Sequence, residues 1–295
     1  LMEGFSRHPF LKGRLALKGG TALNLFMSDV PRLSVDIDLN YIGAIDRDTM
    51  MAERPKVEQA MRAVCSREGI IITRMPTDHA GGKWLLRYES CLGGSGNLEV
   101  DLNYMFRVPL WPVTMRNATI GSYTATKIPV LDLHELAAGK LAALLARKAS
   151  RDLFDAHWLL LRRDYDRIKL RLGFVLYGAM NRKDWRTVNV DDAGYDPREL
   201  ENQLIPVVRS ELLTNMKAND WAATMVAECR DRLGMVLPLS ANEIAFLDLI
   251  LDHGEIKPEL LTNDGEMTER ISTHPLLQWK AVNVCQHKGG KVTLS

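Results

Sequence analysis

A nine-residue run from Arg32 to Asn40 constrains the fold of this chain more than any other segment. Apolar and polar residues alternate along it, which predicts a β-strand, from about Leu33 to Ile42, with one buried face. On such a strand Ser34, Asp36 and Asp38 would share one face, with the two carboxylates about 7 Å apart. That spacing suits a hard cation or a pair of cations. Taken alone, the pattern is more often that of an ordinary half-exposed strand.

A glycine-rich turn precedes this strand. Gly19, Gly20 and Thr21 lie between an apolar stretch and a short helical pattern that begins at Ala22. Backbone N–H groups at a helix N-terminus bind phosphate oxygens, and glycines allow a phosphate to come close. We expect Thr21 to cap the helix and to bond to the phosphate. The glycines alone indicate only a turn, but together with the two aspartates they predict a triphosphate site.

A third carboxylate follows on a later strand pattern. Asp101 stands between Val100 and Leu102, and Glu99 shares its face. A third acid in a phosphoryl-transfer site completes metal coordination and can accept the proton of the attacking hydroxyl. We favour Asp101 over Glu99 because it lies deeper in the strand.

The chain changes character near residue 130. Before it, helix and strand patterns alternate, and after it helical periodicity dominates, so we expect an α/β domain over 1–130 and a helical domain over 131–295. Further strands are predicted near 70–74, 83–90, 98–106 and 122–130, with a hairpin loop at 93–97. Further helices are predicted over much of 46–68 and near 168–180, 218–233 and 241–251.

The helical half opens with a basic stripe. On one continuous helix Lys140, Arg147 and Arg151 would fall within about 40° of one another, and Asp155 would extend the stripe, whereas Asp152 would lie off it. Such a stripe can neutralise the phosphates of a nucleotide. Without the upstream motif, solvated surface charges would be the better interpretation.

Composition excludes several other classes of protein. Of 295 residues, 46% are hydrophobic and 25% charged, as in soluble globular proteins, and the net charge of +1 decides nothing about a nucleic-acid partner. No apolar run reaches the roughly 18 residues of a membrane span. The four scattered cysteines match neither a zinc site nor a disulfide framework. With no recognisable leader, we expect a cytoplasmic protein without a membrane partner.

Taken together, these motifs resemble those of the nucleotidyltransferase superfamily, which has the DNA polymerase β-like fold. More narrowly, L-K-G-G-T-A-L-N-L and R-L-S-V-D-I-D-L are similar to the AbiEii/AbiGii toxin family, which includes the MenT toxins. In the second half, Glu135 to Lys140 matches an E-x-x-x-x-K pattern and Arg151 to Asp155 an R-D-x-x-D pattern of that family. The resemblance implies an α+β fold, with a nucleotidyltransferase domain built on a mixed sheet and a mainly α-helical C-terminal region.

The resemblance also implies a function. It points to a toxin of a toxin–antitoxin or phage-defence system that transfers a nucleoside monophosphate from an NTP to an acceptor hydroxyl, with the tRNA 3′ end as the leading acceptor. A cognate antitoxin would be its protein partner, and Mg²⁺ or Mn²⁺ its cofactor. Asp36, Asp38 and Asp101 would be catalytic metal ligands and Lys140 a catalytic triphosphate ligand. The predicted nucleotide-binding residues are Gly19, Gly20, Thr21, Ser34, Arg147, Arg151, Asp152 and Asp155.

Two alternatives stay open from the sequence. One is nucleotide transfer to a protein or small-molecule hydroxyl. The other is a nucleotide-binding interaction module that kept the fold and lost turnover, against which the intact set of three acids argues.

Overall fold

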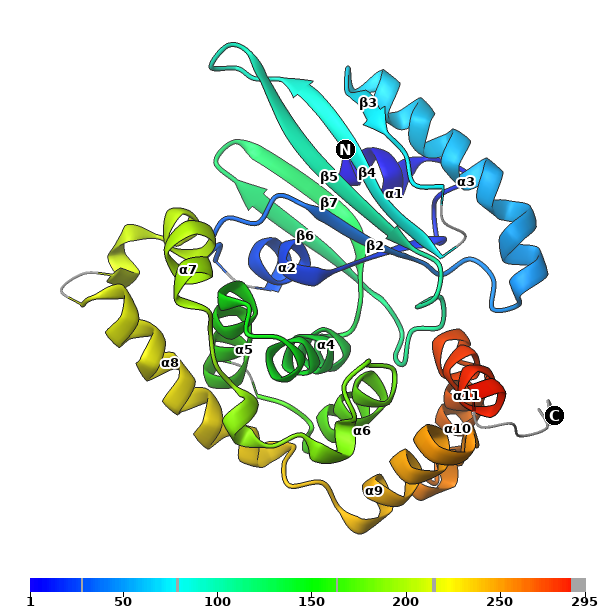
Figure 1. Cartoon of the computed structure of the whole chain (residues 1–295). Coiled ribbons are helices and arrows are strands. Elements are labelled where there is room, and N and C mark those ends of the chain that lie inside the picture. The colour runs from blue at the N-terminus through cyan, green and yellow to red at the C-terminus, as the bar shows by residue number, and fades with distance from the viewer. Residues whose placement is uncertain (28, 78–79, 163, 214–215, 288–295) are drawn as a thin grey trace. The chain divides into compact units, whose positions relative to one another are not determined.

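The structure is a computed structural model, and it describes residues 1–27, 29–77, 80–162, 164–213 and 216–287. The chain divides into two compact units, Leu1–Asp132 and Leu133–Ser295. The sequence placed the change of character at residue 130. A mixed β-sheet forms the centre of the first unit, whereas the described part of the second contains helices and no strand (Figure 1). The predicted α+β class is confirmed.

The first unit is built around a seven-stranded sheet. Strand β2 pairs antiparallel with β1 and parallel with β5, and β1 also pairs parallel with β7. The central strands β1 and β2 are short, and two hairpins, β4–β5 and β6–β7, flank them. The strand order across the sheet is β3 (Ile71–Arg74), β4 (Gly81–Glu89), β5 (Ser95–Asn103), β2 (Ile37–Tyr41), β1 (Leu15–Lys18), β7 (Tyr123–Val130) and β6 (Thr114–Ile120).

Strand β2 begins four residues later than predicted. The sequence indicated a strand from Leu33, but Leu33 and Val35 are 55% and 52% exposed, and the buried apolar residues begin at Ile37. The reason is that β1, the antiparallel partner of β2, ends at Lys18 opposite Asp38. The segment before Ile37 therefore has no strand to pair with on that side, and alternation alone does not make it a strand.

The hairpin predicted around 93–97 is confirmed, with β4 and β5 pairing antiparallel from Glu89↔Ser95 onwards. The edge strand β6 was not predicted from the sequence. Its residues are mostly polar or exposed, so no buried face marks it as a strand, and it is defined by its pairing with β7. Strands of this kind depend on their partner rather than on their own composition.

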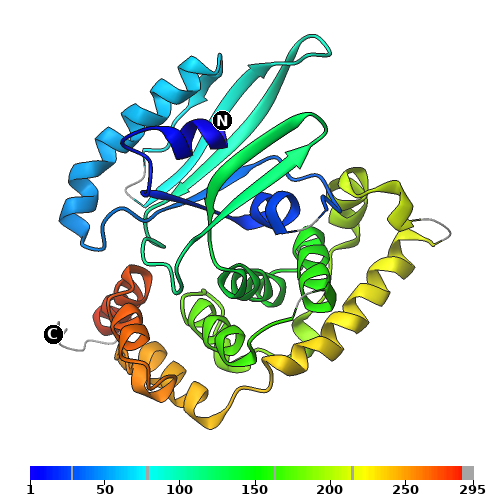
Figure 2. The same ribbon diagram turned by 180° about the vertical axis from the view of Figure 1, so that it is seen from behind.

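Two helices cover one face of this sheet. Helix α1 (Met2–Arg7) packs on β7, and α3 (Arg47–Arg67) is tied to the same face where the Tyr41 hydroxyl donates to Glu53 at 2.6 Å. Figure 2 shows α1 in front of the strands. Asp46 caps α3 by accepting from the Thr49 N–H, and Pro55 lies inside the helix. The charged face of the sheet, described below, is the opposite one.

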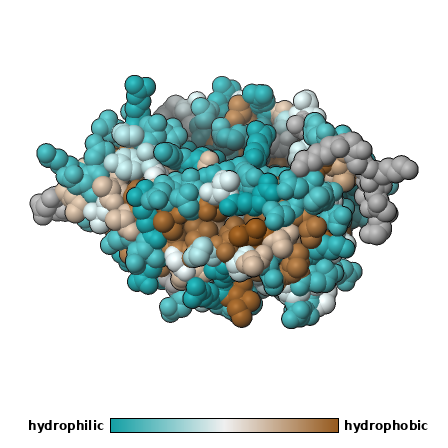
Figure 3. Space-filling model, turned by 60° about the horizontal axis from the view of Figure 1, so that its bottom comes forward, coloured by the Kyte–Doolittle hydropathy of each residue, from teal (hydrophilic) through white to brown (hydrophobic). Residues whose placement is uncertain are grey.

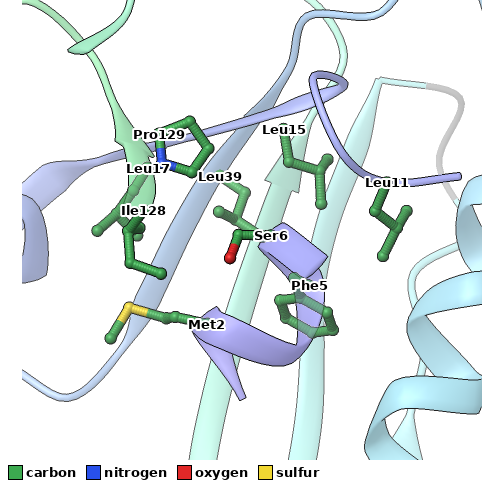
Figure 4. A pocket seen from close by; sticks show the side chains of 9 residues that line it. All are labelled: Met2, Phe5, Ser6, Leu11, Leu15, Leu17, Leu39, Ile128 and Pro129. Carbon is green, nitrogen blue, oxygen red and sulfur yellow. The ribbon is translucent and has the colours of Figure 1, made fainter. Parts of the chain in front are cut away.

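A small apolar cavity lies beneath α1 (Figure 4). Its lining includes Met2 and Phe5 of the helix together with Leu15, Leu17 and Leu39 of the two central strands. These strand residues alternate with Lys18 and Asp38, which point to the other face. The core side of β1 and β2 is therefore apolar, and their polar chemistry is confined to one face.

The second unit is a helical assembly in which α4 packs against α5 and α6. The predicted continuous helix through Lys140 and Arg151 is wrong, because α4 ends at Ala146 and a new helix starts at Ser150. The helices are α4 (Leu133–Ala146), α5 (Ser150–Arg162), α6 (Arg167–Ala179), α7 (Pro197–Glu199), α8 (Ala218–Arg232), α9 (Ala241–Asp248), α10 (Gly265–Ser272) and α11 (Pro275–His287).

The surface of the second unit retains some large hydrophobic side chains, among them Ile168, Ile244 and Trp279. Figure 3 shows a face of the molecule on which hydrophobic residues gather between hydrophilic ones. Among the described helices, none combines the length and the apolar character that crossing a bilayer requires.

Candidate active site

A row of four charged residues crosses the sheet of the first unit. Asp38 on β2 is the register partner of Asp101 on β5 and of Lys18 on β1, and Asp101 is in turn the partner of Lys83 on β4. Cross-strand partners share a face, so two neighbouring carboxylates stand between two ammonium groups. Adjacent strands are about 4.8 Å apart, which places the two acids within reach of one cation.

The Gly-Gly-Thr turn lies against the segment that carries the acids. A Cβ placed on Gly19 would be 2.0 Å from Asp38 Oδ2, and one placed on Gly20 would be 2.7 Å from Ser34 Oγ. The Thr21 hydroxyl lies 3.1 Å from the Ser34 carbonyl oxygen and also contacts the carbonyl oxygen of Asp36. Each residue of the turn thus faces one of the polar residues predicted from the sequence.

Thr21 has a different place from the one predicted. The N-cap of α2 (Gly19–Thr21) is Lys18, and the helix continues as a π-helical turn over Ala22–Met27. The Thr21 side chain is 1% exposed, and its hydroxyl hydrogen can serve one of the backbone acceptors of Ser34 and Asp36. Thr21 therefore positions the segment before β2, and the prediction that it caps the helix is wrong.

Asp36 was predicted to lie within the strand. In the structure it lies one residue before β2. Its backbone is held by Thr21, and its charge is close enough to Lys83 to act on the pKa of that lysine together with the charge of Asp101. The three predicted metal ligands are therefore on one side of the sheet. Within the described ranges, however, no group of three or more His, Cys, Asp or Glu side chains is already arranged to hold a metal ion.

Asn40 adds an unusual feature beside the acids. It lies two residues after Asp38 on the same face, is 0% exposed, and neither atom of its amide group has a hydrogen-bond partner among the described residues. Buried amides are nearly always hydrogen-bonded, if not to protein then to water or a ligand. The Asn40 amide therefore provides an additional hydrogen-bond donor and acceptor next to Asp38.

Lys83 is a cation that the sequence did not single out. Its ammonium lies 2.5 Å from Glu99 Oε2, and its side chain is 63% exposed. The pKa of Lys83 is raised, chiefly by the hydrogen bond to Glu99 and further by the charges of Glu99, Asp36 and Asp101, while partial burial opposes the rise. Only the pairing of β4 with β5 places this lysine beside Asp101, so spacing along the chain could not have found it.

Arg32 is a second residue that the sequence did not single out. Its side chain is 3% exposed, and its Nη2 lies 2.7 Å from the position of a Cβ on Gly20. The guanidinium therefore lies against the glycine turn. In the sequence, only its place as the first residue of the R-L-S-V-D-I-D-L motif, four residues before Asp36, pointed to a role in the site.

Four of the five predicted site residues of the second unit form a charge cluster around two buried aspartates. Lys140 Nζ lies 2.7 Å from Asp155 Oδ2 and 3.3 Å from Asp152 Oδ1, and Arg147 Nε lies 2.6 Å from Asp152 Oδ2. Asp152 is central to this cluster, contrary to the prediction that it lies off the stripe. The correction follows from the break between α4 and α5, which turns α5 back so that its first turns face Lys140.

The hydrogen bond of Arg151 lies outside this cluster. Its guanidinium donates to Gln203 Oε1 at 3.2 Å at the surface. The predicted alignment of Arg151 with Lys140 assumed one unbroken helix, and that assumption fails at residues 147–149.

The contact between Gly19 and Asp38 gives a first prediction. Gly19→Ala would add the strain of a left-handed residue, since φ is +74°, and would also push the Asp38 carboxylate aside. We expect nucleotide transfer to fall by at least tenfold and stability by about 1–3 kcal/mol. The matched control is Gly13→Ala, because φ there is +75° but nothing lies within 4 Å of the added Cβ. Equal activity of the two variants, measured with urea unfolding alongside, would show that the Asp38 contact is unimportant.

Comparison with known proteins agrees with this fold. The chain is similar to MenT4, a nucleotidyltransferase toxin from Mycobacterium tuberculosis H37Rv, with a TM-score of 0.52 and 20% sequence identity over 88% of this chain and 85% of that one. At that identity the likeness concerns the fold. No curated protein matches the sequence.

The class of protein is that of the nucleotidyltransferases. The family model described as "Nucleotidyl transferase AbiEii toxin, Type IV TA system" matches residues 1–231. The chain belongs to this family of toxins, and the resemblance drawn from the sequence motifs is confirmed. Membership implies an NTP substrate and an antitoxin partner. Nucleotidyltransferases generally act with a divalent metal ion.

Proposed function

We propose that this toxin transfers a nucleoside monophosphate from an NTP to the 3′ end of tRNA. The observation that carries the proposal is the register of Asp38 with Asp101 beside the Gly19–Gly20 turn. A pair of acids next to a glycine turn at the start of a helix can serve both a triphosphate and an attacking hydroxyl. The choice of tRNA as acceptor rests on the family resemblance.

The residues fit a divalent metal ion. Asp36, Asp38 and Asp101 supply hard carboxylate oxygens, which Mg²⁺ and Mn²⁺ prefer, and beside them the buried Asn40 amide has no hydrogen-bond partner among the described residues. When bound, the metal would neutralise charge on the reacting phosphate. We propose Mg²⁺ as the resident ion, held by the three aspartates.

The protein's own residues would position the reactants. Gly19 and Gly20 would admit the triphosphate to the backbone, and Ser34 would contact it beside Gly20. Asp101 would accept the proton from the acceptor hydroxyl as that oxygen attacks the α-phosphorus and pyrophosphate leaves. Thr21 would hold Asp36 and Ser34 in place through the backbone. Catalysis of this kind depends on orientation and electrostatics rather than on a covalent intermediate.

The second unit carries the E-x-x-x-x-K pattern of the family, from Glu135 to Lys140. We propose that Lys140 neutralises negative charge on the triphosphate, supported by Arg147, Arg151, Asp152 and Asp155. In the structure the Lys140 ammonium is shared between Asp152 and Asp155, which fixes its position. A pre-positioned cation loses little side-chain entropy when it binds phosphate.

The decisive experiment offers each α-³²P-labelled NTP, with Mg²⁺, to purified total tRNA, to a protein extract and to no acceptor. We expect label on tRNA with wild-type protein and none with Asp38→Asn. Label on protein instead would replace the acceptor in the proposal and leave the reaction class intact. Measurable NTP binding without transfer to either acceptor would favour the non-catalytic binding module.

A further inference from the structure

The charged row on the sheet has two different ends. At one end Lys18 immediately precedes the Gly19–Gly20 turn, which is the proposed triphosphate side. At the other end Lys83 lies beyond Asp101, the proposed base for the acceptor hydroxyl. Because Asp38 and Asp101 separate these two lysines, Lys83 is on the side from which an acceptor would approach Asp101.

The exposure and the pairing of Lys83 allow it to bind an anionic group of a ligand. Among the described residues its hydrogen-bond partner is Glu99, at 2.5 Å, and their side chains are 63% and 36% exposed. Exposed ion pairs contribute little to stability, so Lys83 can exchange Glu99 for another anion at low cost. Lysine is a flexible point charge and is commonly used to bind phosphate.

An acceptor with a phosphate backbone needs such a cation. Asp36, Glu99 and Asp101 would each repel a phosphodiester that approaches this face. A neutral hydroxyl, as in a serine side chain or a sugar, would not meet this repulsion and would gain nothing from the lysine. The position of Lys83 beside Asp101 therefore favours an acceptor with a phosphate backbone over a neutral one.

We propose that Lys83 binds a backbone phosphate near the 3′ end of an acceptor RNA and thereby favours nucleic acid over a neutral acceptor. This inference rests on the proposed nucleotidyl transfer, and it adds the residue that meets the acceptor. Lys83 is then a specificity-determining residue, distinct from the acids and from the residues of the triphosphate turn.

Two readouts test the inference. The first is the dissociation constant of purified total tRNA, measured by filter binding over a series of salt concentrations with Ca²⁺ in place of Mg²⁺. In Lys83→Ala we expect binding about tenfold weaker, because one charge-assisted phosphate contact is lost. We also expect the slope of log K against log salt to become shallower by about 0.7–0.9, the change expected for one phosphate contact.

The second readout is steady-state kinetics. Lys83→Ala should raise the KM for tRNA about tenfold and leave the KM for the NTP unchanged, while Lys83→Arg should retain most tRNA affinity and the salt slope. The matched control is Lys56→Ala, a lysine on α3, which covers the opposite face of the sheet. It should behave as wild type in both assays.

The outcomes separate this inference from the function on which it rests. If wild type transfers no label to tRNA, the proposed acceptor fails first, and the inference falls with it. If wild type transfers label while Lys83→Ala keeps the tRNA affinity, the KM and the salt slope of wild type, the inference alone is overturned. A Lys83→Ala variant that changes only the Mg²⁺ concentration needed for activity would likewise overturn it, since Lys83 would then serve only as a counter-ion to the acids.

Discussion

Asp38→Ala is expected to lower nucleotide transfer by about 10³-fold or more while the protein remains folded. Asp38 is at the centre of the charged row, between Lys18 and Asp101, and its carboxylate lies directly against Gly19. No neighbouring side chain can take over this position, because Asp36 lies before the strand and its backbone is bound by Thr21. The rate is measured with the labelled NTP at saturating tRNA.

The controls for Asp38 separate chemistry from folding. Asp48→Ala removes an aspartate that is 98% exposed on α3, on the other side of the sheet, and should leave transfer unchanged. The temperature of thermal unfolding of Asp38→Ala should equal or exceed that of wild type, because the like charges of Asp38 and Asp101, which are in register, repel each other. Asp38→Asn keeps the shape of the side chain and removes its charge, so full activity in that variant would exclude Asp38 as a metal ligand.

Lys140→Ala is expected to destabilise the second unit by about 3–5 kcal/mol. Its ammonium pairs with Asp152 and Asp155, whose side chains are 4% and 1% exposed, and its removal would break both of these ion pairs with buried carboxylates. Arg147→Ala is the matched control. Arg147 pairs with the same Asp152, but its side chain is 66% exposed, so its loss should cost only about 0–1 kcal/mol. Urea unfolding measures both, and similar values would contradict the assigned role of Lys140.

Because Lys140 stabilises the second unit, lost activity in Lys140→Ala has two possible causes. A loss of transfer in Lys140→Ala would follow from unfolding as well as from a missing phosphate contact. The triple variant Lys140→Met, Asp152→Asn, Asp155→Asn removes the cation and the buried charges together, and it should recover most of the lost stability. If this variant is folded and active, Lys140 is structural only, whereas a folded and inactive variant agrees with a phosphate contact.

The sequence was most informative where local pattern decides local structure. The alternation of Lys83 to Ser90 and of Ser122 to Val130 gave strands whose ends agree with β4 and β7 to within two residues. Helix α3, from Arg47 to Arg67, covers most of the span predicted over 46–68, and α8 lies within a residue of its expected bounds. These elements have a continuous buried face or a capping residue, and such signals are present in a short stretch of chain.

The prediction failed where a neighbour decides the structure. Residues 33–36 alternate like a strand but have no partner beyond Lys18, and β6 has a partner but little alternation. The stripe from Lys140 to Arg151 was drawn on one helix, and the chain breaks between Ala146 and Ser150. In each case hydrogen bonding or packing by distant residues overrides the local pattern.

The sequence by itself determined the family, the α+β class and the residue types of the candidate site. The glycine turn, the D-x-D motif and the later aspartate are visible as short motifs, because each needs only a few adjacent residues. The tertiary structure alone decided which of these residues are neighbours. The order β4, β5, β2, β1 brings Lys83, Asp101, Asp38 and Lys18 into one row, and the contacts of Gly19 and Thr21 fix the segment before β2. Cross-strand register depends on how distant segments pair, so no local spacing in the chain can encode it.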